Sequence, residues 1–281
     1  MLIQEERFTK DLVGYHRRNS NSLSGSCGPG MKRLIISSLL LLVVGCEKNE
    51  ELGYSEQEMI YGLKTHGVRR IEKDEEGYVW LVSFPSTFDL DLDEATDTKV
   101  TDAVLVHLKG LTRLTHLNLD ATGFTDADLK QLKELTSLTD LRLSISEITD
   151  TGLESVEELT SLKYLYLYGT EITDAGLEHL KWMTKLETLN LNSTNMTGTG
   201  LIHLKGLSKL ERLDLSGTEV TDAGLEHLRG LVNLESLDLI WTQTTDAGLE
   251  YLEGLTSLKS LSVGETRVTG AGRAKLMHAL R

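Results

Sequence analysis

The chain has few cysteines, no long apolar run and no excess of positive charge, and each shortage excludes a class of protein. Its 281 residues contain two cysteines, Cys27 and Cys46, too few for the disulfide framework of a small secreted domain. No apolar segment reaches the roughly 20 residues that a helix needs to cross a bilayer. The formal net charge is −14. Such acidity argues against nucleic acid, whose phosphates need a basic surface.

What the chain has in abundance is an internal repeat of 24 residues. Its clearest copy, residues 221–244, reads TDAGLEHLRGLVNLESLDLIWTQT. The first half spaces leucines three apart, as on one face of a helix, and the LxxLxL half ends in the alternation of a strand. Neither half can bury its leucines alone, so the period predicts a solenoid in which stacked blocks share one core and pair their strands in parallel. The seven gapless blocks start at Thr101, Thr125, Thr149, Thr173, Thr197, Thr221 and Thr245, and a partial eighth starts at Thr269.

This pattern resembles that of leucine-rich repeat proteins. The TDAGL motif is similar to that of a bacterial repeat variant in envelope proteins, and to the repeats that follow the F-box in some eukaryotic adaptors. The resemblance is strong over residues 101–281 and extends to 55–100 as an N-terminal cap. It implies an α/β fold, a right-handed leucine-rich repeat solenoid with a parallel β-sheet on the concave face and short helices on the convex face. Such a solenoid offers an extended binding surface rather than one closed pocket.

Outside the complete repeats, the sequence predicts a cap at each end of the core. Ser55 and Glu58 fit a capping box that starts a short helix, and Val68–Lys73 and Tyr78–Phe84 are typical of the two strands of a hairpin. The C-terminal half-repeat shields its end of the sheet less. We expect a leader at 1–30 that is disordered or precedes the true start codon, a signal peptide at 31–45, a tether at 46–54, the N-terminal cap at 55–100, seven repeats at 101–268 and a half-repeat cap at 269–281.

Residues 31–50, MKRLIISSLLLLVVGCEKNE, carry the features of an export signal in the usual order. Lys32 and Arg33 precede a short apolar run that suits a signal-peptide core. The run ends in Val-Val-Gly-Cys, which resembles the lipobox of bacterial lipoproteins. The resemblance implies that Cys46 carries lipid and becomes the first residue of a membrane-anchored lipoprotein of the cell envelope, periplasmic or on the outer surface. The alternative is a buried apolar helix followed by an ordinary cysteine.

Several polar residues recur at fixed places in the repeat, and we interpret them as structural. A threonine opens each block and caps the helix, and in most blocks an aspartate follows at the helix's positive end. The resemblance implies that a second hydroxyl column bonds to the backbone after each strand. Its members are Thr122, Ser146, Thr170, Thr194, Thr218, Thr242 and Thr266. A row of histidines on the convex side does not converge, so we expect no metal site. The row comprises His107, His179, His203 and His227.

The strand residues between the leucines vary from block to block, and they point to the concave side. Three tyrosines of one predicted strand, Tyr164, Tyr166 and Tyr168, face solvent there. Tyr, Trp and Arg dominate binding hot spots because they bury much area at low entropic cost and keep a polar group available. The alternative is that tyrosines simply suit strands. The predicted contact residues are Tyr164, Tyr166, Tyr168, Arg142, Arg212 and Trp241.

The motifs together favour a binding protein over an enzyme. There is no nucleophile elbow and no phosphate-binding glycine loop, so we expect no enzymatic activity and no cofactor. The first hypothesis is a monomeric, lipid-anchored envelope protein whose concave face binds another protein or an extracellular polymer. The alternative is a structural envelope protein with no discrete ligand. An F-box-like adaptor of ubiquitin ligation is disfavoured, because residues 46–100 have no three-helix F-box pattern.

Overall fold

The computed structural model describes residues 55–66, 68–84 and 102–280. The predicted leader, the predicted signal peptide, the predicted tether and the predicted lipidation site at Cys46 lie outside these residues. Within the described ranges, no helix combines the length and the apolar character that crossing a membrane requires.

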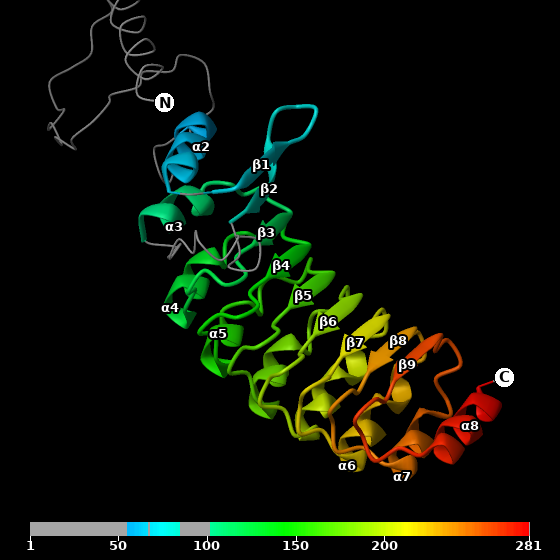
Figure 1. The fold of residues 1–281 in the computed structure, drawn as a ribbon. Helices are drawn as coiled ribbons and strands as arrows, with labels where there is room; N and C mark the ends of the chain where they lie inside the picture. The colour runs from blue at the N-terminus through cyan, green and yellow to red at the C-terminus, as the bar shows by residue number, and fades with distance from the viewer. Residues whose placement is uncertain (1–54, 67, 85–101, 281) are drawn as a thin grey trace, which may run out of the picture. The chain divides into compact units, whose positions relative to one another are not determined.

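One nine-stranded sheet contains its strands in the order of the sequence (Figure 1). The first two strands form an antiparallel hairpin, and each later pair is parallel. From the third strand onward, residues 24 apart are direct partners, so the repeat period sets the register of the sheet. The strands are β1 (Arg70–Lys73), β2 (Val79–Ser83), β3 (His116–Asn118), β4 (Asp140–Arg142), β5 (Tyr164–Tyr166), β6 (Thr188–Asn190), β7 (Arg212–Asp214), β8 (Ser236–Asp238) and β9 (Ser260–Ser262).

From β2 onward, short helical segments return the chain from one strand to the next on the other side of the sheet (Figure 1). Many of them are 3₁₀ rather than α-helical, which refines the prediction. Leucines three apart suit this geometry, because three residues per turn place i and i+3 on one face. The segments are α2 (Glu56–Thr65), α3 (Asp102–Lys109), α4 (Asp126–Leu129), η1 (Lys130–Leu132), α5 (Asp150–Glu154), η2 (Asp174–Leu180), η3 (Thr199–Gly206), α6 (Asp222–Leu225), η4 (Glu226–Gly230), α7 (Asp246–Leu249), η5 (Glu250–Leu252) and α8 (Gly270–Ala279).

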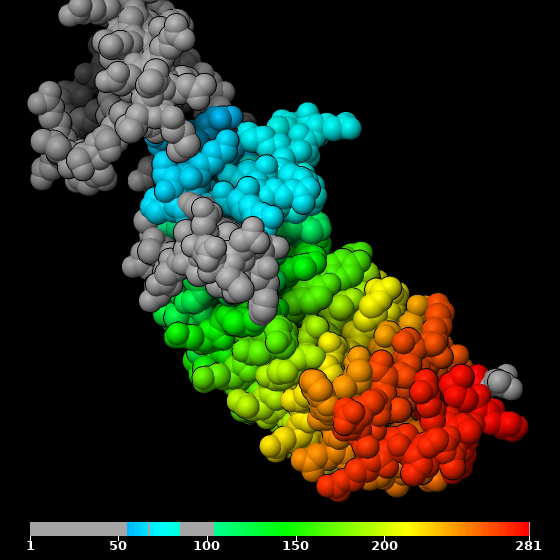
Figure 2. All heavy atoms as spheres, viewed as in Figure 1, coloured from blue at the N-terminus to red at the C-terminus, as the bar shows by residue number. Residues whose placement is uncertain are grey.

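A continuous leucine core lies between the sheet and the helical segments. At the centre of β5, Leu165 has no exposed surface, and neither has Leu177 or Leu180 of the helical segment that follows. Full burial of one leucine stabilises a fold by about 1.5–3 kcal/mol. Figure 2 shows the blocks stacked directly against one another, so each block depends on its neighbours to cover its leucines.

The two ends of this core are covered differently. At the N-terminal end the predicted capping box is present: Ser55 N–H donates to Glu58 Oε2 at 2.7 Å, and Glu58 N–H donates to Ser55 Oγ at 3.3 Å. Leu63 of α2 and Phe84 after β2 are buried. At the C-terminal end, Leu261 of β9 is only partly buried. Half a repeat therefore covers the core less completely than the helix and hairpin do.

Candidate functional site

A ladder of aspartates and threonines joins consecutive repeats at the edge where the helical segments begin. The Asp150 carboxylate accepts hydrogen bonds from Thr173 of the next repeat, from the backbone N–H at 2.8 Å and from Oγ1 at 2.6 Å. The sequence assigned this aspartate to the start of its own helix, and the structure adds this bond to the neighbouring repeat. The same bonds recur between Asp126 and Thr149, Asp174 and Thr197, Asp222 and Thr245, and Asp246 and Thr269.

The glycine of the TDAGL motif makes room for that carboxylate. A methyl group at Gly176 would lie 2.3 Å from Oδ1 of Asp150, which is far inside van der Waals contact. The ladder is interrupted where Gly198 replaces the aspartate. Gly198 has a φ of +106°, and its Cα lies so close to Gly224 that a Cβ on Gly224 would be 2.9 Å away. Glycine therefore permits the close approach of adjacent repeats both where the aspartate is present and where Gly198 replaces it.

Asp174, at the step before this interruption, has the largest set of hydrogen-bond donors in the ladder. Besides Thr197, it accepts from the N–H groups of Gly198 at 3.0 Å and Gly200 at 2.8 Å. Burial raises the pKa of Asp174, but hydrogen bonds from these three residues outweigh it and hold the pKa below its usual value of 3.8. The ionised carboxylate is therefore the form that the fold stabilises.

The second hydroxyl column bonds to the backbone, as the resemblance implied. Thr170 is buried, and its Oγ1 donates to the carbonyl oxygen of Leu167 at 2.7 Å. The same bond recurs at Thr122, Ser146, Thr194, Thr218, Thr242 and Thr266. The structural interpretation of this column is confirmed, which leaves the exposed strand residues as the place where repeats differ most.

The strand face consists of the first and third residues of β3 to β9, which flank the central leucine of each strand. On this face the Arg142 guanidinium lies over the ring of Tyr166, with Cζ 4.5 Å from the ring centroid. Its Nε is 3.4 Å from Oδ1 of Asp140. A cation–π contact restrains both partners, so Arg142 and Tyr166 present one ordered surface that is both aromatic and basic.

Tyr164 is held by a hydrogen bond to the next repeat. Its hydroxyl donates to Oε2 of Glu187 at 3.0 Å, and Nζ of Lys163 lies 3.0 Å from Oε1 of the same carboxylate. The hydrogen bond to Glu187 raises the pKa of Tyr164. Arg212 lies in the same row two strands further on, where it is exposed. The predicted residues Tyr164, Tyr166, Arg142 and Arg212 therefore share the strand face.

The other two predicted contact residues lie beyond the ends of their strands. β5 ends at Tyr166, so the prediction that Tyr168 shares that strand is wrong. Tyr168 lies in the following turn and is 37% exposed. Trp241 lies just past β8, is 68% exposed and has a φ of +58°. This left-handed conformation is uncommon for a bulky residue. Trp241 is three repeats away from Tyr168 along the array, so the structure does not bring it into the tyrosine cluster.

A hollow on the strand face beside Arg142 was not predicted from the sequence. It has a volume of about 210 Å³ and is lined by the cap hairpin and the first two repeats. Strand register brings Arg70, Ser83, Asn118 and Arg142 into one row across β1 to β4. The 24-residue period could not reveal this row, because residues 85–100 separate the hairpin from the first repeat. Only the pairing of β2 with β3 shows that Arg70 belongs to the same surface.

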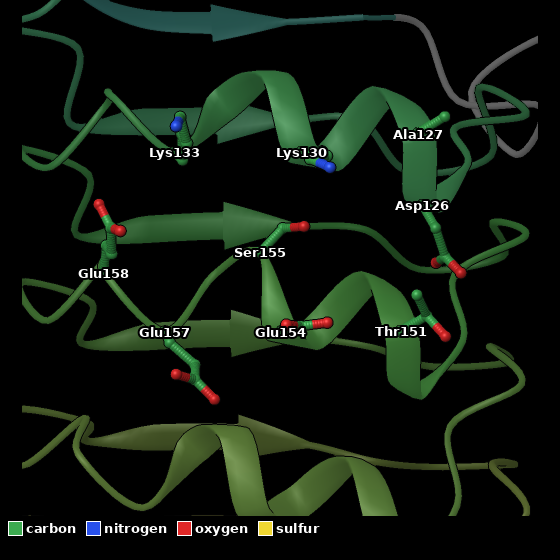
Figure 3. A pocket seen from close by; sticks show the side chains of 9 residues that line it. All are labelled: Asp126, Ala127, Lys130, Lys133, Thr151, Glu154, Ser155, Glu157 and Glu158. Atoms are coloured by element: carbon green, nitrogen blue, oxygen red, sulfur yellow. The ribbon is translucent and has the colours of Figure 1, made fainter.

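A second hollow, of about 440 Å³, lies on the helix side of the second and third repeats. Figure 3 shows Lys130 on η1 with Lys133 just after it, and Glu154 on α5 with Glu157 in the loop that follows. Ser155 also lines this hollow and stands where four other repeats carry a histidine, so a small side chain leaves space there. Within the described residues, no three side chains of the metal-ligating types converge. The hollow is lined by both lysines and glutamates, so its charge does not favour one class of ligand.

Family models of the leucine rich repeat match residues 134–156, 158–181 and 184–243. The chain is a leucine-rich repeat solenoid. It is similar to an internalin C2 of Listeria monocytogenes, with 26% identity over 70% of this chain and 77% of that chain, and a TM-score of 0.55. It is also similar to a leucine-rich repeat protein of Leptospira interrogans, with 23% identity over 62% of this chain and a TM-score of 0.52, and it spans 43% of that chain. No curated protein matches the chain.

Leucine-rich repeat scaffolds of this type are generally used for protein binding and are typically non-enzymatic. Function in such a scaffold depends on the residues that the repeats present, and the fold alone does not specify it. Here the repeats present Tyr166 and Arg142 in contact with each other on the strand face.

Proposed function

We propose that this protein is a lipid-anchored envelope protein that binds another protein through its strand face. The contact residues in this proposal are Tyr164, Tyr166, Tyr168, Arg142, Arg212 and Trp241. Lipid on Cys46 would tether the solenoid to a membrane of the envelope while the repeats bind the partner.

One observation carries the binding part of this proposal. The columns that join the repeats are nearly uniform, whereas the strand-face columns change from block to block and gather tyrosine and arginine in one place. The contact of Arg142 with Tyr166 and the bond from Tyr164 to Glu187 limit the rotamers of these side chains before any partner arrives. A pre-ordered aromatic surface loses less entropy on binding, which favours affinity.

Capture from an envelope extract by the full chain tests the binding site. The test variant is Tyr164→Ser, Tyr166→Ser and Tyr168→Ser together. A matched control removes three exposed apolar side chains outside the strand face: Tyr61→Ser, Trp182→Ser and Val232→Ser. We expect the parent and the control to capture the same protein and the tyrosine variant to lose it while keeping the parental circular dichroism spectrum. Equal capture by all three would place the site elsewhere, and capture of a polysaccharide alone would replace the protein partner with a polymer.

Membrane anchoring has a separate test, because it depends on one residue outside the described structure. Cys46→Ser removes the only atom to which the lipid could attach in the predicted motif. We expect this variant to move from the membrane fraction to the soluble fraction, and Cys27→Ser to leave the distribution unchanged. Retention of Cys46→Ser in the membrane fraction would contradict the anchor without bearing on the strand face.

A further inference from the structure

The hollow beside Arg142 is a trough with an arginine on each wall. Its floor includes Ser83 of β2 and Asn118 of β3, which are short, whereas Arg70 of β1 and Arg142 of β4 stand on either side. Three strand spacings separate the two arginine backbones, a distance of about 14 Å. The short residues between the two arginines leave the trough open between them.

The hairpin wall of the trough is fixed to the first repeat. The Arg113 guanidinium lies over the ring of Tyr78, 3.8 Å from its centroid, and its Nη1 donates to Glu76 Oε2 at 3.1 Å. Trp80 of β2 also contacts the imidazole of His116 edge to face, with ring centroids 5.0 Å apart. These contacts hold β1 and β2 in place, so the position of Arg70 does not depend on a ligand.

The guanidinium groups keep donors available. Arg142 contacts Asp140 through Nε and stacks on Tyr166, and its terminal nitrogens donate no hydrogen bond to any residue that the structure describes. One Nη of Arg70 pairs with Glu72. An arginine has five N–H donors and binds a carboxylate through two parallel bonds. Against two arginines, the trough itself is lined by a single carboxylate, that of Asp140.

We propose that this trough binds the carboxylate of an aspartate or glutamate side chain of the protein partner. The inference rests on the proposed function, because it names the chemistry that a protein on the strand face would place beside the tyrosines. The partner's carboxylate lies between Arg70 and Arg142, and its neighbouring residues extend over Tyr166. Arginine clusters recognise acidic motifs in this way.

Three small probes test the trough on the full chain labelled with ¹⁵N at arginine. N-acetylglutamate α-amide carries only a side-chain carboxylate, and N-acetylglutamine carries only a main-chain carboxylate. N-acetylglutamine α-amide carries neither. We expect the first to shift the Nε–H signals of Arg70 and Arg142 saturably, and Arg273 on α8 to stay unchanged. The fitted Kd should rise about tenfold in Arg142→Gln and again in Arg70→Gln/Arg142→Gln, and it should stay at the parental value in Arg273→Gln.

Each alternative result overturns the carboxylate site in a recognisable way. Equal shifts with the neutral probe would mean amide contacts alone, and shifts that grow without saturation would mean general screening of charge. Binding of the main-chain carboxylate about tenfold tighter would assign the trough to a chain terminus instead of a side chain. Partner capture that is lost with the tyrosines but kept in Arg70→Gln/Arg142→Gln would remove this inference. It would also remove Arg142 from the proposed contact residues, and it would leave protein binding through the tyrosines intact.

Discussion

The ladder edge and the strand face follow the same 24-residue period, yet they repeat with very different strictness. On the ladder edge, the same aspartate–threonine bonds link successive repeats at five junctions. On the strand face, the column that contains Tyr166 holds seven residues of five types. They are Asn118, Arg142, Tyr166, Asn190, Asp214, Asp238 and Ser262.

This difference separates two requirements on the same repeat. The aspartate–threonine bonds at each junction are part-buried or exposed, and a change there leaves a donor or a carboxylate without its partner. Strand-face side chains contribute little to the core, so they are free to differ, and we propose that the distinctive group among them contacts a partner. Substitutions on the ladder edge should therefore lower stability more than binding. Substitutions on the strand face should lower binding more than stability.

The largest expected effect comes from the leucine between the two strand-face tyrosines of β5. Leu165→Ala leaves a cavity in a site with no exposed surface, so we expect a loss of about 3 kcal/mol in the free energy of unfolding by urea. A loss below about 1 kcal/mol would mean that the blocks close around the gap, and that the core is less tightly packed than the structure indicates.

A smaller effect is expected where the ladder meets the repeat glycine. Gly176→Ala places a Cβ 2.3 Å from Oδ1 of Asp150, and we expect a loss of about 2 kcal/mol despite the better helix propensity of alanine. Gly206→Ala is the control, because its Cβ would meet the nearest atom at 3.7 Å. A double-mutant cycle of Gly176→Ala with Asp150→Ala should be less than additive. Additive losses would show that the carboxylate does not require the glycine.

Acid should weaken the ladder edge at Asp174. Because the folded-state pKa of Asp174 lies below 3.8, its contribution to stability is present above that pH and is lost as pH falls through the folded pKa. We expect the parent to lose more stability than Asp174→Asn on acidification from about pH 5. Thermal unfolding across that range measures the difference, and parallel curves for the two proteins would contradict the assignment.

The smallest effect on stability is expected on the strand face itself. Tyr166→Ala removes a partly exposed ring and its contact with Arg142, so the unfolding free energy should fall by less than about 1 kcal/mol. Partner capture should fall far more. A large loss of stability with unchanged capture would mean that the strand face serves stability and not binding.

Much of the fold could be predicted from the sequence, because a 24-residue period leaves few ways to bury the leucines. The period predicted the parallel sheet and its register, and Ser55 with Glu58 predicted the start of α2. The 3₁₀ geometry of η2 and η3 was not predicted, although the leucine spacing of three was visible. The Asp150–Thr173 bond was also missed, since a residue that suits its own helix gave no reason to look 23 positions further on.

Less of the candidate site could be predicted. Alternation placed Tyr164, Tyr166 and Arg142 on one surface, because the strand geometry is local. It could not show that β5 ends before Tyr168, nor that the hairpin adds Arg70 to the same row. Those features depend on pairing between segments whose separation does not follow the repeat.

Hydroxyl-radical footprinting of the full chain, with and without its captured partner, tests the central claim most directly. The account predicts that bound partner protects Tyr166 and Tyr168 from oxidation and leaves Tyr61 and Trp182, which are exposed outside the strand face, as reactive as in the free chain. Protection of Tyr61 or Trp182 with unchanged reactivity of Tyr166 and Tyr168 would contradict it.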